Sequence, residues 1–425
     1  MTNDATQPRD SGELALYGGP KTRSTPVITS GKRFDETELN ELKEALDQQT
    51  LFYWHGEKVK TFRRQFAHLY GVKHCHMVTS GTAALHVAVA SAGVGPGDEV
   101  ITSPMTDQGT VIAILAQGGV PVFADLDPHA YSITPDSVAA CITSRTKALI
   151  VVHLAGNAAD MEGILLVARK HELAVIEDCA QSYLCWYKGR LAGTLGDIGC
   201  FSLNDFKHIS AGDAGMVITN DDALSERAAL FLDKGYARDG TGRRPPFLAF
   251  NYRPSELHGA VAIAQLRKLA QICAKRNMLG DRLTSRILDT PGLYPHKVFD
   301  GCKSSYWFYL GRMDPKVLGV SRGEFVRAVA AEGVPVTPGY IGKMVYEYPV
   351  LAEHRAYENC SYPWDDKYGR KIPYGPGMCP VAEEIEATSW RAPISEFMNE
   401  EDVDDIAAAL KKVARHYVRK HTGAA

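Results

Sequence analysis

The sequence predicts an α/β fold in which helices cover both faces of a mostly parallel sheet, followed by a smaller α+β domain. Patterns typical of strands and of helices alternate over residues 60–260, which is the order that builds a parallel sheet. Residues 148–153 form a continuous apolar run, as expected for a strand buried on both faces. With 425 residues, the chain is long enough for a large core and two domains.

The individual elements follow from hydrophobic periodicity and from the glycines and prolines at their ends. Short apolar runs predict strands at residues 74–78, 99–103, 120–124, 148–153, 174–177, 199–203 and 215–219. Amphipathic or alanine-rich stretches predict helices at residues 61–70, 82–92, 110–117, 135–142 and 164–171. The glycines at residues 93–97 follow a helix rather than a strand, so we interpret them as a helix stop and not as a dinucleotide-binding loop.

The sequence pattern changes near residue 270. A long helix at residues 266–288 could link two domains, and residues 358–379, rich in Tyr, Pro, Gly and Asp, predict a long surface loop. The remaining elements expected there are a segment at 306–313 and helices at 322–332 and 400–415. We therefore expect a lead-in at residues 1–30, flexible over its polar first 13 residues, a large domain at 31–265 and a small C-terminal domain at 266–425.

Composition excludes several classes of function. The formal net charge of −3 offers no basic field for nucleic acid, and no apolar run approaches the length that crosses a membrane. The polar N-terminus lacks the apolar core of a signal peptide. Nine cysteines without C-x-x-C spacing indicate reduced thiols, and therefore a cytoplasmic protein. His74 and His76 share one strand face without further ligands, so no metal site is expected.

Two patterns suggest chemistry. Ser80, Gly81 and Thr82 lie between a predicted strand and a predicted helix, where backbone N–H groups suit a phosphate, although a plain helix cap also fits. Asp178 directly follows a buried strand, and Lys207 lies in a polar loop further along. A carboxylate that pairs with a pyridinium nitrogen and an amine that holds an aldehyde as an imine are the minimum for pyridoxal 5′-phosphate (PLP) chemistry. An ordinary strand-end aspartate and a solvated lysine remain the alternative.

The chain resembles the DegT/DnrJ/EryC1/StrS family of sugar and cyclitol aminotransferases. The resemblance extends from Ala15 to Val403. Its successive matches are Ser80-Gly-Thr-Ala-Ala-Leu85, Gly95-Pro-Gly-Asp-Glu-Val100, Glu177-Asp-Cys-Ala-Gln181, Lys188-Gly-Arg190, Gly196-Asp-Ile-Gly-Cys-Phe-Ser202, Lys207, Gly212-Asp-Ala-Gly-Met216 and Asn251-Tyr-Arg-Pro-Ser-Glu256. It implies a fold type I PLP-dependent transferase with a seven-stranded, mostly parallel sheet.

The resemblance also implies roles for single residues. Lys207 would carry PLP as a Schiff base and move the proton, Asp178 would pair with the pyridine nitrogen, and Gln181 would lie near the cofactor's O3′ oxygen. The phosphate cradle would be formed by Ser80, Gly81, Thr82 and Ser202. Asn251 would reach the phosphate of the neighbouring subunit, which implies a homodimer with shared active sites.

The sequence departs from the family pattern at three places. Asp107 stands where members usually place an aromatic residue against the cofactor ring, so we count it among the cofactor-binding candidates. Either the stacking is lost, or another side chain covers the ring, or Asp107 contacts substrate instead. Residues 204–206 and 212–215 also differ from the usual motifs. Further candidates for substrate contacts are His208, Tyr340, Tyr346, Trp390 and Arg391. A structural role explains His208 equally well, and core or surface packing is the favoured explanation for the other four.

The implied function is an aminotransferase of aminosugar, secondary-metabolite or antibiotic biosynthesis. An amino acid, glutamine or glutamate, would donate its amino group to a keto-sugar, a nucleotide keto-sugar or a keto-cyclitol. A sugar dehydratase of the same family, another PLP reaction on an amino acid and a non-catalytic regulatory protein are the alternatives. The dehydratase branch replaces the lysine with histidine, whereas this chain keeps Lys207.

Overall fold

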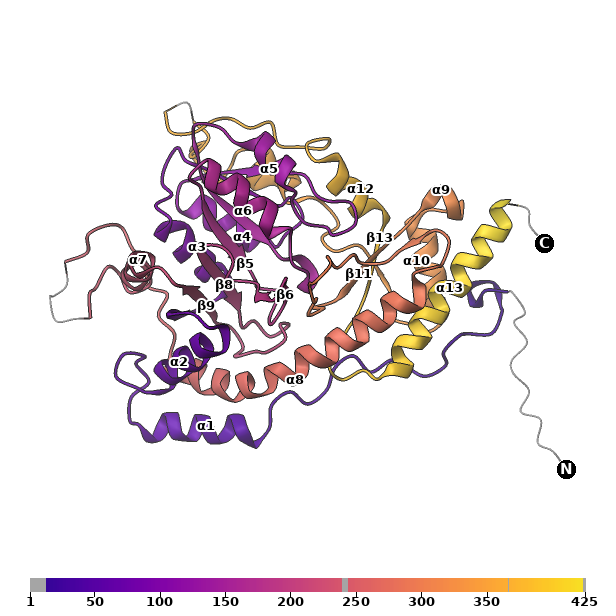
Figure 1. Ribbon diagram of the computed structural model, residues 1–425, viewed down its shortest axis with the longest axis horizontal. Helices are drawn as coiled ribbons and strands as arrows, with labels where there is room; N and C mark the ends of the chain where they lie inside the picture. The colour runs from indigo at the N-terminus through magenta and orange to yellow at the C-terminus, as the bar shows by residue number, and fades with distance from the viewer. Residues whose placement is uncertain (1–12, 239–243, 366, 423–425) are drawn as a thin grey trace.

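The computed structural model describes residues 13–238, 244–365 and 367–422 (Figure 1). Its main element is a seven-stranded sheet with the strand order β1-β9-β8-β5-β4-β2-β3. The strands are β1 (His74–Val78), β2 (Glu99–Thr102), β3 (Val120–Phe123), β4 (Thr146–Val152), β5 (Ala174–Asp178), β8 (Ile198–Ser202) and β9 (Gly215–Thr219). β9 runs antiparallel to both of its neighbours, β1 and β8, and the other neighbouring strands of this sheet pair in parallel. The predicted α/β class and the seven predicted strands are confirmed.

Helices cover both faces of this sheet because successive strand residues are apolar. Ile150 packs into one core beneath the sheet, and Val151, the next residue, packs into the core on the other face. The first face is covered by α3 (Gly81–Ser91) and α7 (Asp222–Leu232). The opposite face is covered by α2 (Lys58–Tyr70), α5 (Pro135–Cys141) and α6 (Met161–Lys170), while α4 (Gln108–Ala116) contributes to both cores.

A long helix, α8 (Glu256–Ile287), runs from the large sheet to the C-terminal part of the chain (Figure 1). At 1.5 Å per residue, its 32 residues span about 48 Å. It begins ten residues before the predicted start at 266, because Ser255 and His258 form a capping box there. The predicted boundary between residues 265 and 266 therefore falls inside α8, and the division into domains stays a prediction. Another helix, α1 (Glu36–Asp47), packs beside α8.

The C-terminal part contains a four-stranded antiparallel sheet with the order β10-β11-β13-β12. Its elements are β10 (Leu293–Tyr294), β11 (Tyr309–Met313), β12 (Thr337–Pro338), β13 (Ser389–Ala392), α9 (Pro315–Leu318), α10 (Arg322–Ala331) and α13 (Glu400–Thr422). Leu14 of the N-terminal segment is buried in the same core, and Glu332 accepts hydrogen bonds from the backbone of Ala15 and Thr22. The N-terminal segment is thus packed against this domain at Leu14, Ala15 and Thr22, while the flexible stretch predicted at residues 1–13 lies, except for Glu13, outside the described residues.

The remaining short elements join these two parts. They are η1 (Ala15–Tyr17), η2 (Leu154–Gly156), the two-stranded ribbon β6 (Trp186–Tyr187) and β7 (Arg190–Leu191), η3 (Val345–Glu347), α11 (Pro349–Ala352) and α12 (Pro380–Thr388).

The segment 358–379 contains no helix or strand among its described residues, as predicted, but it is not simply a surface loop. Trp364 and Tyr374 are buried, and the Trp364 indole donates a hydrogen bond to the Tyr374 hydroxyl (3.1 Å). That hydroxyl donates in turn to the carbonyl of Pro121 in the edge strand β3 (2.6 Å). The segment therefore covers the open edge of the large sheet, where backbone groups would otherwise lack partners.

Candidate active site

Lys207 lies in the loop between β8 and β9, and its side chain is partly buried. Its Nζ atom sits 3.8 Å from the centroid of the Trp307 ring, whose indole nitrogen donates to the carbonyl of Phe206 (2.7 Å). Burial lowers the pKa of Lys207 to about 8, although the carboxylates of Asp178 and Asp107 raise it. A substantial neutral fraction of this amine is therefore present near neutral pH, and a neutral amine can act as a nucleophile or a base.

Asp178 ends β5, at the C-terminal edge of the parallel sheet where ligands bind in such folds. Its carboxylate accepts hydrogen bonds from the Thr110 hydroxyl (2.9 Å) and from the backbone N–H of Ala180 (3.1 Å). Burial raises the pKa of Asp178, while these hydrogen bonds and the charge of Lys207 lower it. Thr110, in turn, shares a hydrogen bond with Thr106 (2.8 Å), so a short polar chain fixes the carboxylate.

The N-terminus of α3 has the properties of an anion cradle. The Ser80 hydroxyl caps the helix by accepting from Ala83 N–H (3.0 Å), so this residue serves as a cap. Within the described chain, the N–H groups of Gly81 and Thr82 have no partner. A Cβ atom at Gly81 would lie only 2.7 Å from Cβ of Ser202, so glycine keeps this space open beside the Ser202 hydroxyl. Free N–H groups at a helix N-terminus favour a phosphate.

Gln181 links the large sheet to the C-terminal part of the chain. Its amide oxygen accepts from Ala155 N–H (2.8 Å), and its amide nitrogen donates to the Tyr340 hydroxyl (2.9 Å). The Tyr340 ring packs against Trp307 and Phe308, with centroid distances of 6.3 and 5.2 Å. Tyr340 therefore borders the surroundings of Lys207, as its candidacy for a substrate contact requires.

Arg391 lies at a cavity of about 390 Å³ that is also lined by Phe206, Trp307, Phe308 and Thr337. The guanidinium carbon is 5.5 Å from the centroid of the Phe308 ring. In the part of the chain that the structure describes, the guanidinium of Arg391 makes neither an ion pair nor a hydrogen bond. An unpaired guanidinium beside the lysine loop is suited to an anionic group of a substrate.

Asp107 is exposed and caps α4, with one carboxylate oxygen accepting from Gly109 N–H (2.8 Å). Its charge raises the pKa of Lys207, Asp178 and Tyr340, which places it near all three. The aromatic side chain expected by analogy at this position is absent, and Trp307 supplies the aromatic surface next to the lysine instead.

Three candidates for substrate contacts are corrected by the structure. His208 is fully buried and bonded to the carbonyl of Ser305 (2.9 Å), and burial holds the pKa of its imidazole well below its usual value. Trp390 stacks on Tyr309 inside the C-terminal core, at a centroid distance of 5.6 Å. Tyr346 is buried and donates to Glu383 (2.5 Å). All three side chains are packed inside the protein, although His208 Nδ1 and Trp390 Nε1 have no hydrogen-bond partner among the described residues.

Asn251 is exposed, and its neighbours are not the other predicted site residues. Its backbone forms a bridge with Asp233, and its side chain accepts from Arg253 N–H (3.4 Å). Among the described residues of the same chain, the structure does not bring Asn251 to Lys207. This placement agrees with a role toward a neighbouring subunit but does not test it.

A buried cluster of His153, Glu177 and Cys179 has the spacing of a metal site. However, His153 already bonds Glu177 (2.9 Å) and accepts from Ala159 N–H (3.1 Å). The Glu177 carboxylate also accepts from three backbone N–H groups, at Gly193, Leu195 and Gly196. Because these hydrogen bonds already engage the ligand atoms, we interpret the cluster as a polar part of the core.

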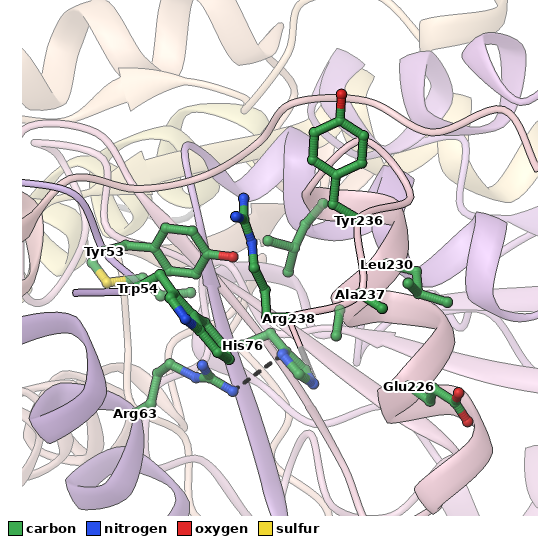
Figure 2. Close-up of a pocket in the computed structure, with 12 residues that line it drawn as sticks. Tyr53, Trp54, Arg63, His76, Glu226, Leu230, Tyr236, Ala237 and Arg238 are labelled. Atoms are coloured by element: carbon green, nitrogen blue, oxygen red, sulfur yellow. Dashed lines mark hydrogen bonds between the residues drawn. The ribbon is translucent and has the colours of Figure 1, made fainter. Parts of the chain in front are cut away.

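A second cavity, of about 300 Å³, is lined by residues that include Tyr53, Arg63, His76 and Arg238 (Figure 2). His76 contacts Arg63 (3.2 Å) on one side and the Ser225 hydroxyl (2.8 Å) on the other. Both ring nitrogens of His76 are thus engaged within the protein, and none of the predicted site residues lines this cavity.

The sheet with its edge carboxylate, its lysine of lowered pKa and its open helix N-terminus defines a fold type I PLP-dependent enzyme. The chain belongs to the DegT/DnrJ/EryC1/StrS aminotransferase family, whose model matches residues 32–411. It is therefore a PLP-dependent aminotransferase.

Similar proteins agree with this assignment. A putative L-glutamine:3-amino-2,3-dideoxy-scyllo-inosose aminotransferase of Streptoalloteichus tenebrarius is 33% identical over 96% of this chain and 99% of its own length. A GDP-perosamine synthase of Caulobacter vibrioides is 33% identical over 73% of this chain and 84% of its own. The crystal structure of DesI with its TDP-sugar product has a TM-score of 0.78 and 28% identity, covering 96% and 98% of the two chains.

Sequence reasoning missed Thr110, Trp307 and Phe308. Thr110 was placed in a helix, and residues 306–313 were recognised only as part of the smaller domain. Residue type alone gave no functional signal for them, because threonine and aromatic residues are common in any core. Thr110 lies one helical turn after Thr106, and that spacing, next to the unusual Asp107, was the available clue.

Proposed function

We propose that this enzyme moves the amino group of glutamine or glutamate to a ketone on a sugar, a nucleotide sugar or a cyclitol. The observation that carries the proposal is the Lys207 amine, with a pKa of about 8, next to Asp178. The substrate class is supported by relatives named as an L-glutamine:2-deoxy-scyllo-inosose aminotransferase and a GDP-perosamine synthase. Aminosugar or secondary-metabolite biosynthesis is the corresponding pathway class.

PLP, when bound, withdraws electrons from the donor's α-carbon and holds the amino group between the two halves of the reaction. Lys207 would hold the cofactor covalently until the donor's amino group displaces it. Its freed neutral amine would then take a proton from the donor's α-carbon in the first half of the reaction and deliver a proton to the acceptor carbon in the second. Asp178 would keep a negative charge opposite the protonated ring nitrogen. The N–H groups of Gly81 and Thr82 and the Ser202 hydroxyl would bind the phosphate.

Three side chains at the rim are proposed to contact substrate. Arg391 offers a free guanidinium to an anionic group, and Tyr340 offers a hydroxyl that Gln181 holds in place. Asp107 keeps one carboxylate oxygen unbonded within the described chain and can bind a hydroxyl or an amine. Together these groups would select polar substrates, as sugars and cyclitols are.

Transamination is favoured over the dehydratase alternative by two neighbouring residues. The lysine is present and accessible at position 207, whereas His208 is buried and already bonded to the Ser305 carbonyl. The histidine therefore cannot replace the lysine as a base without a rearrangement of the loop.

A screen with isotope-labelled glutamine tests the proposed function. The PLP-loaded protein is incubated with glutamine labelled with ¹⁵N at the α-amine and with a set of keto-sugars, nucleotide keto-sugars and keto-cyclitols. We expect the visible absorbance of the lysine-bound cofactor to disappear with the donor alone and a ¹⁵N-labelled amine product to appear by mass spectrometry. Glutamine labelled only at the side-chain amide is the control and should give unlabelled product. An absorbance band unmoved by every amino acid would refute the proposal.

We further propose that the enzyme is a homodimer in the cytoplasm. Exposed apolar side chains gather around Asn251, and the adjoining segments 51–54 and 248–257 are joined by the Phe52–Ser255 bridge. The residues of this apolar patch are Leu51, Trp54, Leu248, Phe250 and Leu257, with Leu248 81% exposed. Apolar patches of this kind mark association surfaces. All nine cysteines are free, as expected in a reducing compartment, and no helix in the described ranges could span a membrane.

Replacing Leu248 with aspartate is expected to shift the protein from dimer to monomer, because a charge would be buried in the interface. Asn251→Ala should leave the dimer intact but weaken PLP retention about tenfold, since one phosphate contact across the interface is lost. Light scattering and cofactor absorbance after dialysis measure the two effects. Leu166→Asp, which changes another well exposed leucine (64%) outside the patch, is the control for the first variant. A PLP-loaded, active monomer would contradict the shared site.

A further inference from the structure

The loop that carries Lys207 is held by the guanidinium of Arg33. Arg33 donates to three main-chain carbonyls of this loop, those of Asp205, Lys207 (2.6 Å) and His208 (3.1 Å). The loop lies between β8 and β9 and contains no helix or strand, so it has few backbone hydrogen bonds of its own. A planar guanidinium with five donors can satisfy several carbonyls at once, which a lysine ammonium cannot do with fixed geometry.

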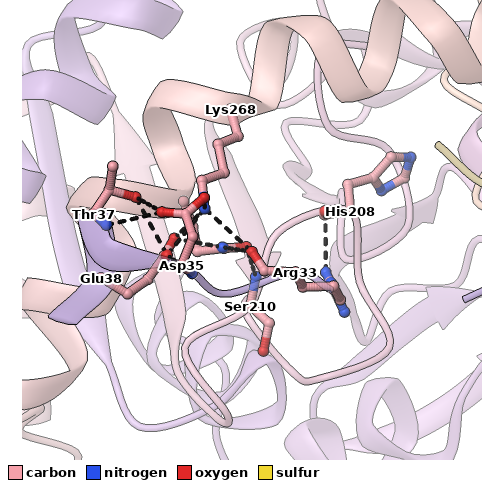
Figure 3. A network of polar contacts seen from close by, with 8 residues as sticks. Arg33, Asp35, Thr37, Glu38, His208, Ser210 and Lys268 are labelled. Atoms are coloured by element: carbon pink, nitrogen blue, oxygen red, sulfur yellow. Dashed lines mark hydrogen bonds and ion pairs between the residues drawn. The ribbon is translucent and has the colours of Figure 1, made fainter. Parts of the chain in front are cut away.

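Arg33 is itself fixed by the helix that links the two parts of the protein. Its carbonyl accepts from the side chains of Gln265 (3.1 Å) and Lys268 (3.2 Å), both on α8. Lys268 also forms ion pairs with Asp35 (2.9 Å) and Glu38 (2.7 Å) next to Arg33 in sequence, as Figure 3 shows. The N-terminal segment is therefore locked to α8 on one side and to the lysine loop on the other.

The same network reaches the loop by a second route. The Gln265 amide oxygen accepts from the backbone N–H of Ser210 (3.3 Å), and its amide nitrogen also donates to Glu38 (2.8 Å). The loop is thus held on both sides of Lys207. Arg33 binds the carbonyls of Asp205 and His208, and Gln265 binds the N–H of Ser210. These contacts involve backbone atoms of the loop, so they fix the position of the main chain of Lys207 and leave its amine free.

Charge alone does not explain this arrangement. The pKa of Lys207 is set by burial and by the carboxylates of Asp178 and Asp107, whereas Arg33 faces Asp205, Glu396 and Arg276. Burial lowers the pKa of Arg33, but a guanidinium is not deprotonated in proteins, so its charge persists. The guanidinium therefore acts on the lysine through the backbone.

We propose that Arg33 is a positioning residue that places Lys207 for covalent capture of PLP. The inference rests on the proposed role of Lys207, whose amine forms a bond to the aldehyde carbon of PLP as water leaves. Without the hydrogen bonds from Arg33, the main chain of Lys207 samples other positions, and its amine is less often within reach of the aldehyde. A misplacement of about 1 Å is enough to slow a positioned reaction about 10²-fold.

The test compares cofactor capture in Arg33→Ala, Arg33→Lys and Arg23→Ala. Arg23 is a matched control, because it lies in the same N-terminal segment and pairs with Asp402 (2.8 Å) and Asp405 (2.8 Å) on α13, without touching the loop. Each cofactor-free protein is mixed with PLP, and the absorbance of lysine-bound cofactor is followed with time. Hydrogen exchange of the amides of residues 204–211 is measured by mass spectrometry on the same samples.

We expect capture to slow about 10²-fold in Arg33→Ala and less in Arg33→Lys, with faster amide exchange in both and wild-type behaviour in Arg23→Ala. Added methylguanidine should restore part of the rate in Arg33→Ala. Equal effects in Arg33→Ala and Arg23→Ala would overturn the proposal, since they would indicate a general packing defect of the segment. If Arg33→Ala does not fold, unchanged capture and exchange in Arg33→Lys overturn it. Wild-type protein that captures no PLP at Lys207 would instead refute the role of the lysine itself.

Discussion

Lys207→Ala is expected to abolish transamination, with a loss of about 10⁴-fold or more, because no other amine takes over both the covalent link and the proton transfer. The visible absorbance of lysine-bound cofactor should be lost as well. Borohydride reduction of the PLP-loaded wild-type protein, followed by peptide mapping, should place the pyridoxyl group on Lys207. Lys188→Ala is the control, because Lys188 is an exposed lysine that pairs with Glu162. Retained activity in Lys207→Ala, or a label on another residue, would exclude the assignment.

The same lysine is expected to influence stability in the cofactor-free protein. Folding lowers the pKa of Lys207 from 10.5 to about 8, so the native state binds this proton less tightly than the unfolded state does. The resulting cost, about 2 kcal/mol after allowance for partial exposure, is fully present below pH 8 and vanishes as the pH rises toward 10.5. Lys207→Ala should therefore be more stable than wild type to urea at pH 7, and this difference should shrink at pH 10.

Asp178→Asn is expected to lower turnover by about 10²- to 10³-fold, because the amide cannot hold a negative charge opposite the ring nitrogen. Asparagine has nearly the same shape: its one amide oxygen can accept from Ala180 N–H, and its amide nitrogen, in place of the second oxygen, can donate to the Thr110 hydroxyl, so the fold should persist. PLP retention after dialysis should fall together with the rate of donor-dependent loss of the visible band.

The control for this variant is Asp222→Asn, which removes an exposed carboxylate on α7 that pairs with Lys73 and His74. In the cofactor-free protein, Asp178→Asn should be as stable as wild type or more so near neutral pH. Burial raises the pKa of Asp178, so folding disfavours the charged carboxylate. At neutral pH this charged form costs stability, and asparagine removes the cost. Full activity in Asp178→Asn would be incompatible with the proposed role.

Much of the fold could be predicted because its signals are local. The strands of the large sheet are short apolar runs bounded by turn residues, and their predicted ends agree closely with the structure. Helix α1 was missed although Asp35 and Glu38 form a capping box at its start. Its apolar side chains are few, so periodicity gave little indication. The start of α8 was misplaced because the first turns of this helix are packed against α2 and lack a clear polar face.

The residues of the candidate site also fall into those that local sequence signals place and those that only tertiary packing places. Asp178, Gln181 and the 80–82 segment are fixed by the strands and helix they adjoin, so their sequence positions largely determine where they lie. Other side chains of the site come from distant parts of the chain, and only packing brings them to the lysine loop. They are Arg33, Tyr340, Trp307 and Arg391. Trp390 and Tyr346 illustrate the converse, since both face a core although their residue types suit a binding site.

The sequence by itself determined the α/β class, the PLP-dependent family and the lysine and aspartate on which the chemistry depends. These follow from patterns within a few residues, where the side-chain period and the order of elements are fixed. Tertiary structure alone decided which side chains surround the amine, how the 358–379 segment covers the sheet edge and how Arg33 holds the lysine loop. Contacts between residues far apart in the chain depend on how the elements pack, and no local pattern encodes that geometry.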